Sequence, residues 1–242
     1  MDDATRAELA SRWAYRAGLE LSASHRFRRL AGRMDAVGLP AELVTIASRA
    51  AEQELDHVEL CADIAGRFGV RPELAMPVVP EIAPEPFSPR ERVVYELVAF
   101  CCITETANAS VVTAGADDID DAAIRRAVRT ILADEVQHSR LGWRFLASHP
   151  LDDAQRDWLA DYLPDMLRGT VRDDLFKPQP IVGDEATMQK YGTLPIEGRR
   201  QAFLLGMRDV VLPGLTGAGV DVSEGARFLD ELEASIDGDA LR

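Results

Sequence analysis

Aromatic residues and cysteines are scarce in this chain of 242 residues. Aromatics make up 6% of it, which is low for a β-sandwich and ordinary for a helical protein. The three cysteines include the adjacent pair Cys101 and Cys102, and an odd, partly vicinal set of this kind is not a disulfide framework. We therefore expect a reducing, cytoplasmic environment.

Positive charge and long apolar stretches are also lacking. The chain has 27 Lys and Arg residues against 41 Asp and Glu residues, which gives a formal net charge of −14. Such an acidic surface repels phosphate, so we expect neither a nucleic acid nor an anionic membrane as a partner. The longest apolar runs, such as residues 97–103, are far shorter than the roughly 18–20 residues of a membrane span. The acidic N-terminal sequence MDDATRAELASRW contains no apolar segment typical of a signal peptide.

What the chain does contain is helical periodicity along most of its length, and no convincing alternating strand pattern. Stop and start signals such as Gly38, Pro40 and the Ser88–Pro89 pair delimit the predicted helices. Four long helices are predicted at 3–36, 40–69, 88–114 and 121–148. Beyond Pro150 we expect helices at 152–167, 197–211 and 223–236, and a loop at 176–196.

The segment between the second and third helices is rich in proline. Five prolines in residues 70–87 exclude a helix and favour an extended linker. The second helix, at ~30 residues, is ~45 Å long, whereas the linker, fully extended, spans up to ~60 Å. The linker can therefore return along the whole bundle, which predicts a four-helix bundle with one long crossover in residues 1–150. Residues 151–242 are expected to form a helical extension packed on this bundle.

Two Glu-x-x-His motifs occur in the predicted helices, one formed by Glu54 and His57 and the other by Glu135 and His138. Residues three apart lie on one face of a helix, so each motif can offer a carboxylate and an imidazole to the same ion. Both motifs lie near the middle of a helix, on the stripe of positions spaced four and three apart that faces a bundle core. This placement favours metal binding over a chance occurrence.

The other two long helices each carry one glutamate on the corresponding stripe, Glu20 and Glu105. No Lys or Arg lies on any of the four stripes. Buried carboxylates without a basic partner each cost several kcal/mol or have to take up protons. Two divalent cations would balance the four negative charges, and oxygen and imidazole ligands suit iron or manganese. The competing interpretation is a helical bundle with scattered polar residues in its core.

This set of residues resembles the di-iron carboxylate proteins of the ferritin-like superfamily, which include rubrerythrins, bacterioferritins and di-iron oxygenases. The resemblance covers roughly residues 4–148 and implies an all-α, ferritin-like four-helix bundle. It also implies that six residues are both metal ligands and catalytic residues: Glu20, Glu54, His57, Glu105, Glu135 and His138. In this family pattern the carboxylates of Glu54 and Glu135 would bridge the two metals.

Residues next to the ligands are expected to support them. Asp134 precedes Glu135, as in the DExxH form of many such enzymes, and is expected to bond the free nitrogen of His57. Gln53 has the matching place in the other motif. Cys101 lies on the stripe of Glu105, where it either lines an O₂ site or simply packs in the core. Small stripe residues such as Gly142 could leave room for a substrate pocket.

Departures from particular branches narrow the resemblance. The chain has no Cys-x-x-Cys iron module of the rubrerythrin type, and Leu55 stands where bacterioferritins have a haem-binding Met. What remains implies an O₂-activating oxidase or oxygenase with two Fe ions, or a Mn/Fe pair, O₂ as co-substrate and a small organic substrate. The alternatives are a ferroxidase or peroxide-scavenging protein and a non-catalytic bundle that keeps the metal for stability. An electron-donor protein and a homodimer are further expectations.

Overall fold

The computed structural model describes residues 1–171 and 182–239, and no strand occurs among them. The predicted all-α class is therefore confirmed. The chain forms two compact units. The first comprises Met1–Glu96, Gly115–Asp134 and Ile181–Pro195, and the second comprises Leu97–Ala114, Glu135–Pro180 and Ile196–Arg242. The predicted domain boundary near residue 150 stays a prediction.

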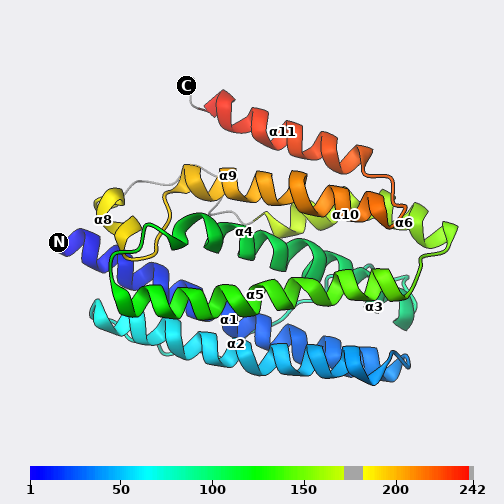
Figure 1. The fold of residues 1–242 in the computed structure, drawn as a ribbon, viewed down its shortest axis with the longest axis horizontal. Helices are drawn as coiled ribbons and strands as arrows, with labels where there is room; N and C mark the ends of the chain where they lie inside the picture. The colour runs from blue at the N-terminus through cyan, green and yellow to red at the C-terminus, as the bar shows by residue number, and fades with distance from the viewer. Residues whose placement is uncertain (172–181, 240–242) are drawn as a thin grey trace. The chain divides into compact units, whose positions relative to one another are not determined.

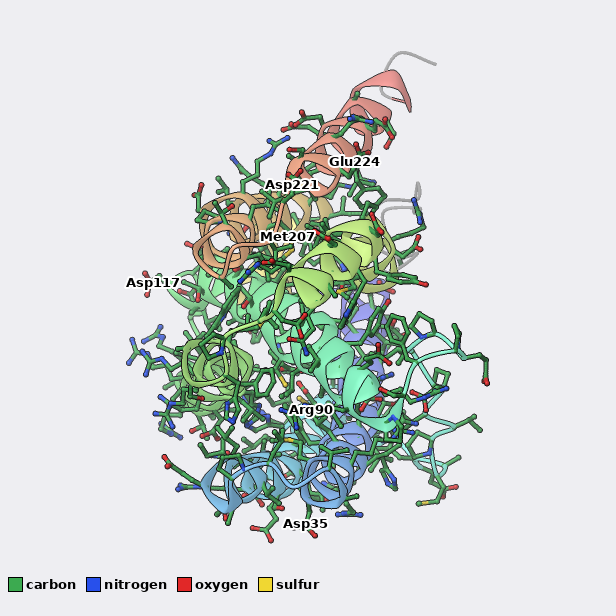
Figure 2. All side chains as sticks on the ribbon, turned by 90° about the vertical axis from the view of Figure 1, so that its right-hand side faces the viewer. Asp35, Arg90, Asp117, Met207, Asp221 and Glu224 are labelled. Atoms are coloured by element: carbon green, nitrogen blue, oxygen red, sulfur yellow. The ribbon has the colours of Figure 1, made fainter. Side chains whose placement is uncertain are left out.

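The first unit is built on two long helices that lie side by side, α1 (Asp3–Ala36) and α2 (Ala41–Arg67) (Figure 1). The side chain of Asp2 caps the start of α1 by accepting a hydrogen bond from the backbone of Thr5. The chain leaves α1 through Gly38, whose φ of 72° is in the left-handed region that favours glycine. Asp35, near this end of α1, lies on the outer side of the pair (Figure 2). Both predicted helices are confirmed to within two residues at each end.

The proline-rich linker of the first unit is extended and is bound to α1 by arginines. Arg29 donates hydrogen bonds to the carbonyl oxygens of Val79, at 2.8 Å, and Pro80, at 3.0 Å. Arg33 donates to the carboxylate of Glu81 at 3.0 Å. Prolines remove backbone donors, so a linker of this composition cannot form a helix, and its carbonyl groups need other partners.

Helix α3 (Pro89–Glu96) follows the linker and ends in a buried acid. Glu96 accepts hydrogen bonds from Arg33 at 2.7 Å and from Arg29 at 3.5 Å. Burial raises the pKa of the Glu96 carboxyl, and the charges of the two arginines oppose this shift. The same arginines therefore hold both the linker and α3 against α1.

The third predicted helix is interrupted by a π-helical segment. After α3 the chain continues as the π-helix η1 (Leu97–Thr104) and then as α4 (Glu105–Ala116). The whole segment Pro89–Ala116 is long and apolar enough to cross a membrane, and 61% of its most apolar window is buried inside the protein. Core helices of globular proteins share this length and composition, so the feature is weak evidence for a membrane span.

The second unit packs its helices around the two π-helical segments. Helix η1 contacts α6 (Asp153–Thr170) and the second π-helix, η2 (Met207–Val211). Helix η2 joins α9 (Ile196–Gly206) to α10 (Leu212–Gly217), and α11 (Ser223–Asp239) packs on α6. Met207, which is fully buried, lies among the helices of this unit (Figure 2). The predicted helices 152–167 and 197–211 are both longer in the structure, and the second includes η2 and α10.

Helix α5 (Ala122–Ser148) contributes its C-terminal half to the second unit. At Gly142 an added Cβ would lie 2.5 Å from the sulfur of Cys102 and 2.7 Å from the carbonyl oxygen of Leu97. The expectation that Gly142 leaves space for a pocket is therefore wrong. The missing side chain lets α5 and η1 approach each other closely.

Residues 182–195, called the docking segment below, belong to the first unit. The sequence predicted a loop at 176–196, but the segment contains α8 (Glu185–Lys190), which the side chain of Asp184 caps. The part of that loop at 176–181 lies outside the described residues. The backbone of Asp184 donates to the hydroxyl of Thr5 at 2.9 Å, so this segment is bound to the start of α1.

Candidate metal centre

Helices α1 and α2 bring together a first ligand set, formed by Glu20, Glu54 and His57. Each residue offers a ligand atom, and these atoms lie within 4.8 Å of one another. Glu20 is 4% exposed, and Glu54 and His57 are 0% exposed. Two carboxylates and an imidazole at this spacing and depth can hold a metal ion, because each buried charge needs a cation or hydrogen bonds to replace water.

The imidazole of His57 is held between two carboxylates. Its Nδ1 lies 3.1 Å from Oε2 of Glu54, and its Nε2 lies 3.2 Å from Oδ2 of Asp134. The other oxygen of Asp134 accepts a hydrogen bond from the side-chain amide of Gln53 at 2.5 Å. A neutral ring that donates from Nε2 to Asp134 keeps its lone pair on Nδ1, beside Glu54. The contact between Asp134 and His57 is the one that the sequence led us to expect.

Glu20 has a basic partner that the sequence analysis did not foresee. Nε of Arg16 donates to Oε1 of Glu20 at 2.9 Å. The expectation that no cationic side chain accompanies the carboxylates is therefore wrong for Glu20. Arg16 lies one helical turn before Glu20, off the core stripe, but its long side chain reaches the glutamate along the helix surface.

A second ligand set, formed by Glu105, Glu135 and His138, lies in the second unit. The ligand atoms of these residues also lie within 4.8 Å of one another, and none of the residues is more than 1% exposed. Nδ1 of His138 lies 3.8 Å from Oε2 of Glu135. In each Glu-x-x-His motif the same ring nitrogen, Nδ1, faces the glutamate of its own motif.

Glu105 is the first residue after the π-helix η1. The hydroxyl of Thr104 hydrogen-bonds to the carbonyl oxygen of Ala99 and to the hydroxyl of Thr170, each at 3.0 Å. Cys101 and Cys102 are fully buried, and burial raises the pKa of the Cys102 thiol. The expectation that Cys101 adjoins the ligands stays a prediction.

The donor chemistry of both sets fits a hard or borderline divalent metal. Each set has two carboxylates and one imidazole, and neither contains a thiolate, a combination that suits iron or manganese. Sequence reasoning found all six of these residues but missed the contacts of Arg16 and Gln53. The sequence contains a sign of each contact. Arg16 and Glu20 are four residues apart on one helix, and Gln53 and Asp134 have equivalent positions in the two motifs.

Comparison with known proteins does not add a family assignment. The chain matches none of the known family models and none of the curated proteins. The resemblance to di-iron carboxylate proteins therefore depends on the residues and contacts described above.

Proposed function

We propose that this protein is an O₂-activating oxidase or oxygenase that uses two iron ions, or a Mn/Fe pair, to oxidise a small organic substrate. The single observation that carries the proposal is the pair of buried ligand sets, each with two glutamates and one histidine. A bound iron pair would supply the activation of O₂. An electron donor, which could be a partner protein, would return the metals to the reduced state.

In this proposal both ligand sets hold metal, and the residues that would hold the two ions are Glu20, Glu54, His57, Glu105, Glu135 and His138. Glu135 directly follows Asp134, which contacts His57 of the first set, so one stretch of α5 serves both sets. Four carboxylates with two divalent ions are close to electrically neutral, which favours burial of the whole group. Asp134 would keep a proton on Nε2 of His57 and so leave the lone pair of Nδ1 available to a metal.

The proposed fold is a ferritin-like four-helix bundle made of α1, α2, the continuous helix from α3 to α4, and α5. The contacts of Arg29 and Arg33 support the crossover. They bind linker residues 79–81 near the C-terminal end of α1, whereas the linker starts from the C-terminal end of α2. A linker that runs back in this way makes α3 start at the end of the pair where α1 ends.

Loading with iron under anaerobic conditions, followed by exposure to O₂, tests the proposed activity. We expect uptake of two Fe(II) per chain, consumption of O₂ and a transient absorbance whose decay an organic substrate accelerates. Oxidation of many irons per chain into a mineral would instead identify a ferroxidase. Metal uptake without O₂ consumption would identify a centre that only stabilises the protein, and both results would contradict the proposal.

Substitution of ligands tests the site itself. We expect Glu54→Ala and His138→Ala each to abolish stable binding of the metal pair, because each removes a buried donor that no neighbouring residue replaces. Glu52→Ala is the matched control, since Glu52 is exposed and lies on the same helix as Glu54. Iron counted by plasma emission after gel filtration gives the readout. Two irons per chain in both ligand variants would remove the site assignment.

A further inference from the structure

We propose that Arg16 is a positioning residue for the ligand Glu20, and that the docking segment holds Arg16 in place through Trp13. The inference deepens the proposed function and depends on it, because it assumes that Glu20 binds metal. It assigns a role to two features outside the six ligands, the arginine on α1 and residues 191–192.

The contact between Arg16 and Glu20 leaves the glutamate able to bind an ion. Nε of Arg16 donates to Oε1 of Glu20. A carboxylate has two oxygens and about four lone-pair positions, so it can accept this bond and still coordinate a metal. The bond holds one oxygen of the glutamate and so favours one orientation of its carboxylate plane.

Trp13 precedes Arg16 on α1 by three residues, which is slightly less than one helical turn. The guanidinium carbon of Arg16 is 5.8 Å from the centroid of the indole ring, within the range of a cation–π contact. Trp13 is itself 2% exposed, and its Nε1 donates to the carbonyl oxygen of Tyr191 at 3.1 Å. The ring therefore provides a fixed surface for the arginine.

Gly192 allows the docking segment to reach the indole. Its φ is +81°, and an added Cβ would lie 2.9 Å from Cζ2 of Trp13. A residue with a side chain would be strained in this backbone conformation and would push the ring. A continuous series of contacts thus connects the docking segment to Trp13, Arg16 and finally Glu20, all within the first unit.

Two effects of Arg16 on a bound ion have opposite signs. Its positive charge repels a cation, whereas its hydrogen bond orients the ligand. The side chain of Arg16 is 24% exposed, so water screens part of the repulsion. Water does not weaken the orientation in the same way, and loss of such supporting partners typically lowers metal affinity by about 10–100-fold. We therefore infer that support of Glu20 outweighs repulsion.

Titration of the full-length protein with Co(II) tests this inference without any catalytic turnover. We expect Arg16→Ala to weaken the binding of one Co(II) by about 10–100-fold and to change the visible absorption spectrum, which reports the coordination of the metal. Arg16→Lys keeps the charge and a donor and should restore part of the affinity. A purely structural role for Arg16 would leave the spectrum unchanged.

The chain offers a closely matched control on the same helix. Arg12 donates to Glu8 at 2.7 Å with the same four-residue spacing, and the two side chains are 30% and 21% exposed. Arg12→Ala should leave Co(II) binding and the spectrum unchanged. Equal or tighter binding by Arg16→Ala would overturn the inference while the metal site stands. Failure of the unaltered protein to bind Co(II) would overturn the proposed function and the inference with it.

Discussion

At the scale of single residues, the two nitrogens of His57 have different tasks. Nε2 faces Asp134 and Nδ1 faces Glu54. A carboxylate that accepts a hydrogen bond from one ring nitrogen makes the other nitrogen a stronger donor to a metal. Gln53 in turn holds Asp134, so the orientation of the ring depends on three neighbours from two helices.

Asp134→Asn is expected to weaken metal binding without unfolding the protein. The amide oxygen can still accept from Nε2, but its negative charge is gone, so the imidazole becomes a poorer donor. Loss of a partner of this kind lowers affinity by about 10–100-fold. Competition titrations with Mn(II) or Co(II) measure the change. Asp56→Asn, an exposed substitution on α2, is the control, and equal affinities for the two variants would contradict this account of His57.

The residues of the site were predictable from the sequence to different degrees. The glutamates and histidines of the motifs were found because their spacing places them on core-facing stripes. Arg16 was missed because a stripe records only which positions face the core, whereas a long arginine side chain reaches sideways along its helix to Glu20. The lack of space at Gly142 was missed because packing depends on the partner helix, which the local sequence does not specify.

At the scale of helices and linkers, capping residues and helix-breaking residues in the sequence predicted where the helices begin and end. Asp2 and Gly38 delimit α1, and the prolines of 70–87 keep the linker free of helix. The π-helix η1 was not predictable. It has eight residues, and a sequence pattern this short does not distinguish the periodicity of a π-helix from that of an α-helix. Helix α8 was missed because it has only six residues and lies between glycines. It contacts α1, and a helix of this length is not stable by itself in water.

Gly142→Ala tests the close packing of α5 on η1. The added methyl group would meet the sulfur of Cys102 at 2.5 Å and its backbone nitrogen at 3.0 Å, so the helices would have to move apart. We expect the free energy of unfolding to fall by about 1–3 kcal/mol, as measured by urea denaturation. Gly32→Ala on α1 is the control, because it meets no atom within 4 Å. It should instead gain about 0.5–1 kcal/mol from helix propensity. Equal effects of the two substitutions would refute the packing argument.

The linker contacts predict how stability depends on pH. The Arg33 guanidinium lowers the pKa of Glu81 from 4.5 to about 2. A carboxylate whose pKa falls on folding stabilises the folded state above its unfolded pKa, and this contribution disappears as the pH falls through the folded value. Glu81→Gln should therefore destabilise the protein at pH 6 and have little effect near pH 2.

Urea denaturation of the Glu81→Gln variant at several pH values checks this dependence. Glu85→Gln is the matched control on the same linker, because the side chain of Glu85 is 97% exposed, and it should change stability little at any pH. The free energies of unfolding of Glu81→Gln and of the unaltered protein should differ less at pH 2 than at pH 6. A difference that stays constant over this range would show that the ion pair with Arg33 does not hold the linker on α1.

At the scale of the whole molecule, the proposed ligands come from helices far apart in the chain, and the formal charge is −14. An unfolded chain does not hold either ligand set together, so ions that bind these sets bind the folded state. Binding should therefore raise the free energy of unfolding by about 2.7 kcal/mol per site at a free ion concentration of 100 times the dissociation constant. Thermal denaturation with increasing Mn(II) measures this stabilisation, and Mg(II) at the same ionic strength controls for screening of surface charge.

The number of metal ions bound per chain tests the central claim most directly. Equilibrium dialysis of the full-length protein against Fe(II) without O₂, followed by metal analysis, gives this number. We expect two Fe(II) ions per chain in the unaltered protein. We expect the Glu54→Ala variant to bind neither of them stably. Binding of no tightly held iron, or of the same two ions after the glutamate is removed, would contradict the account.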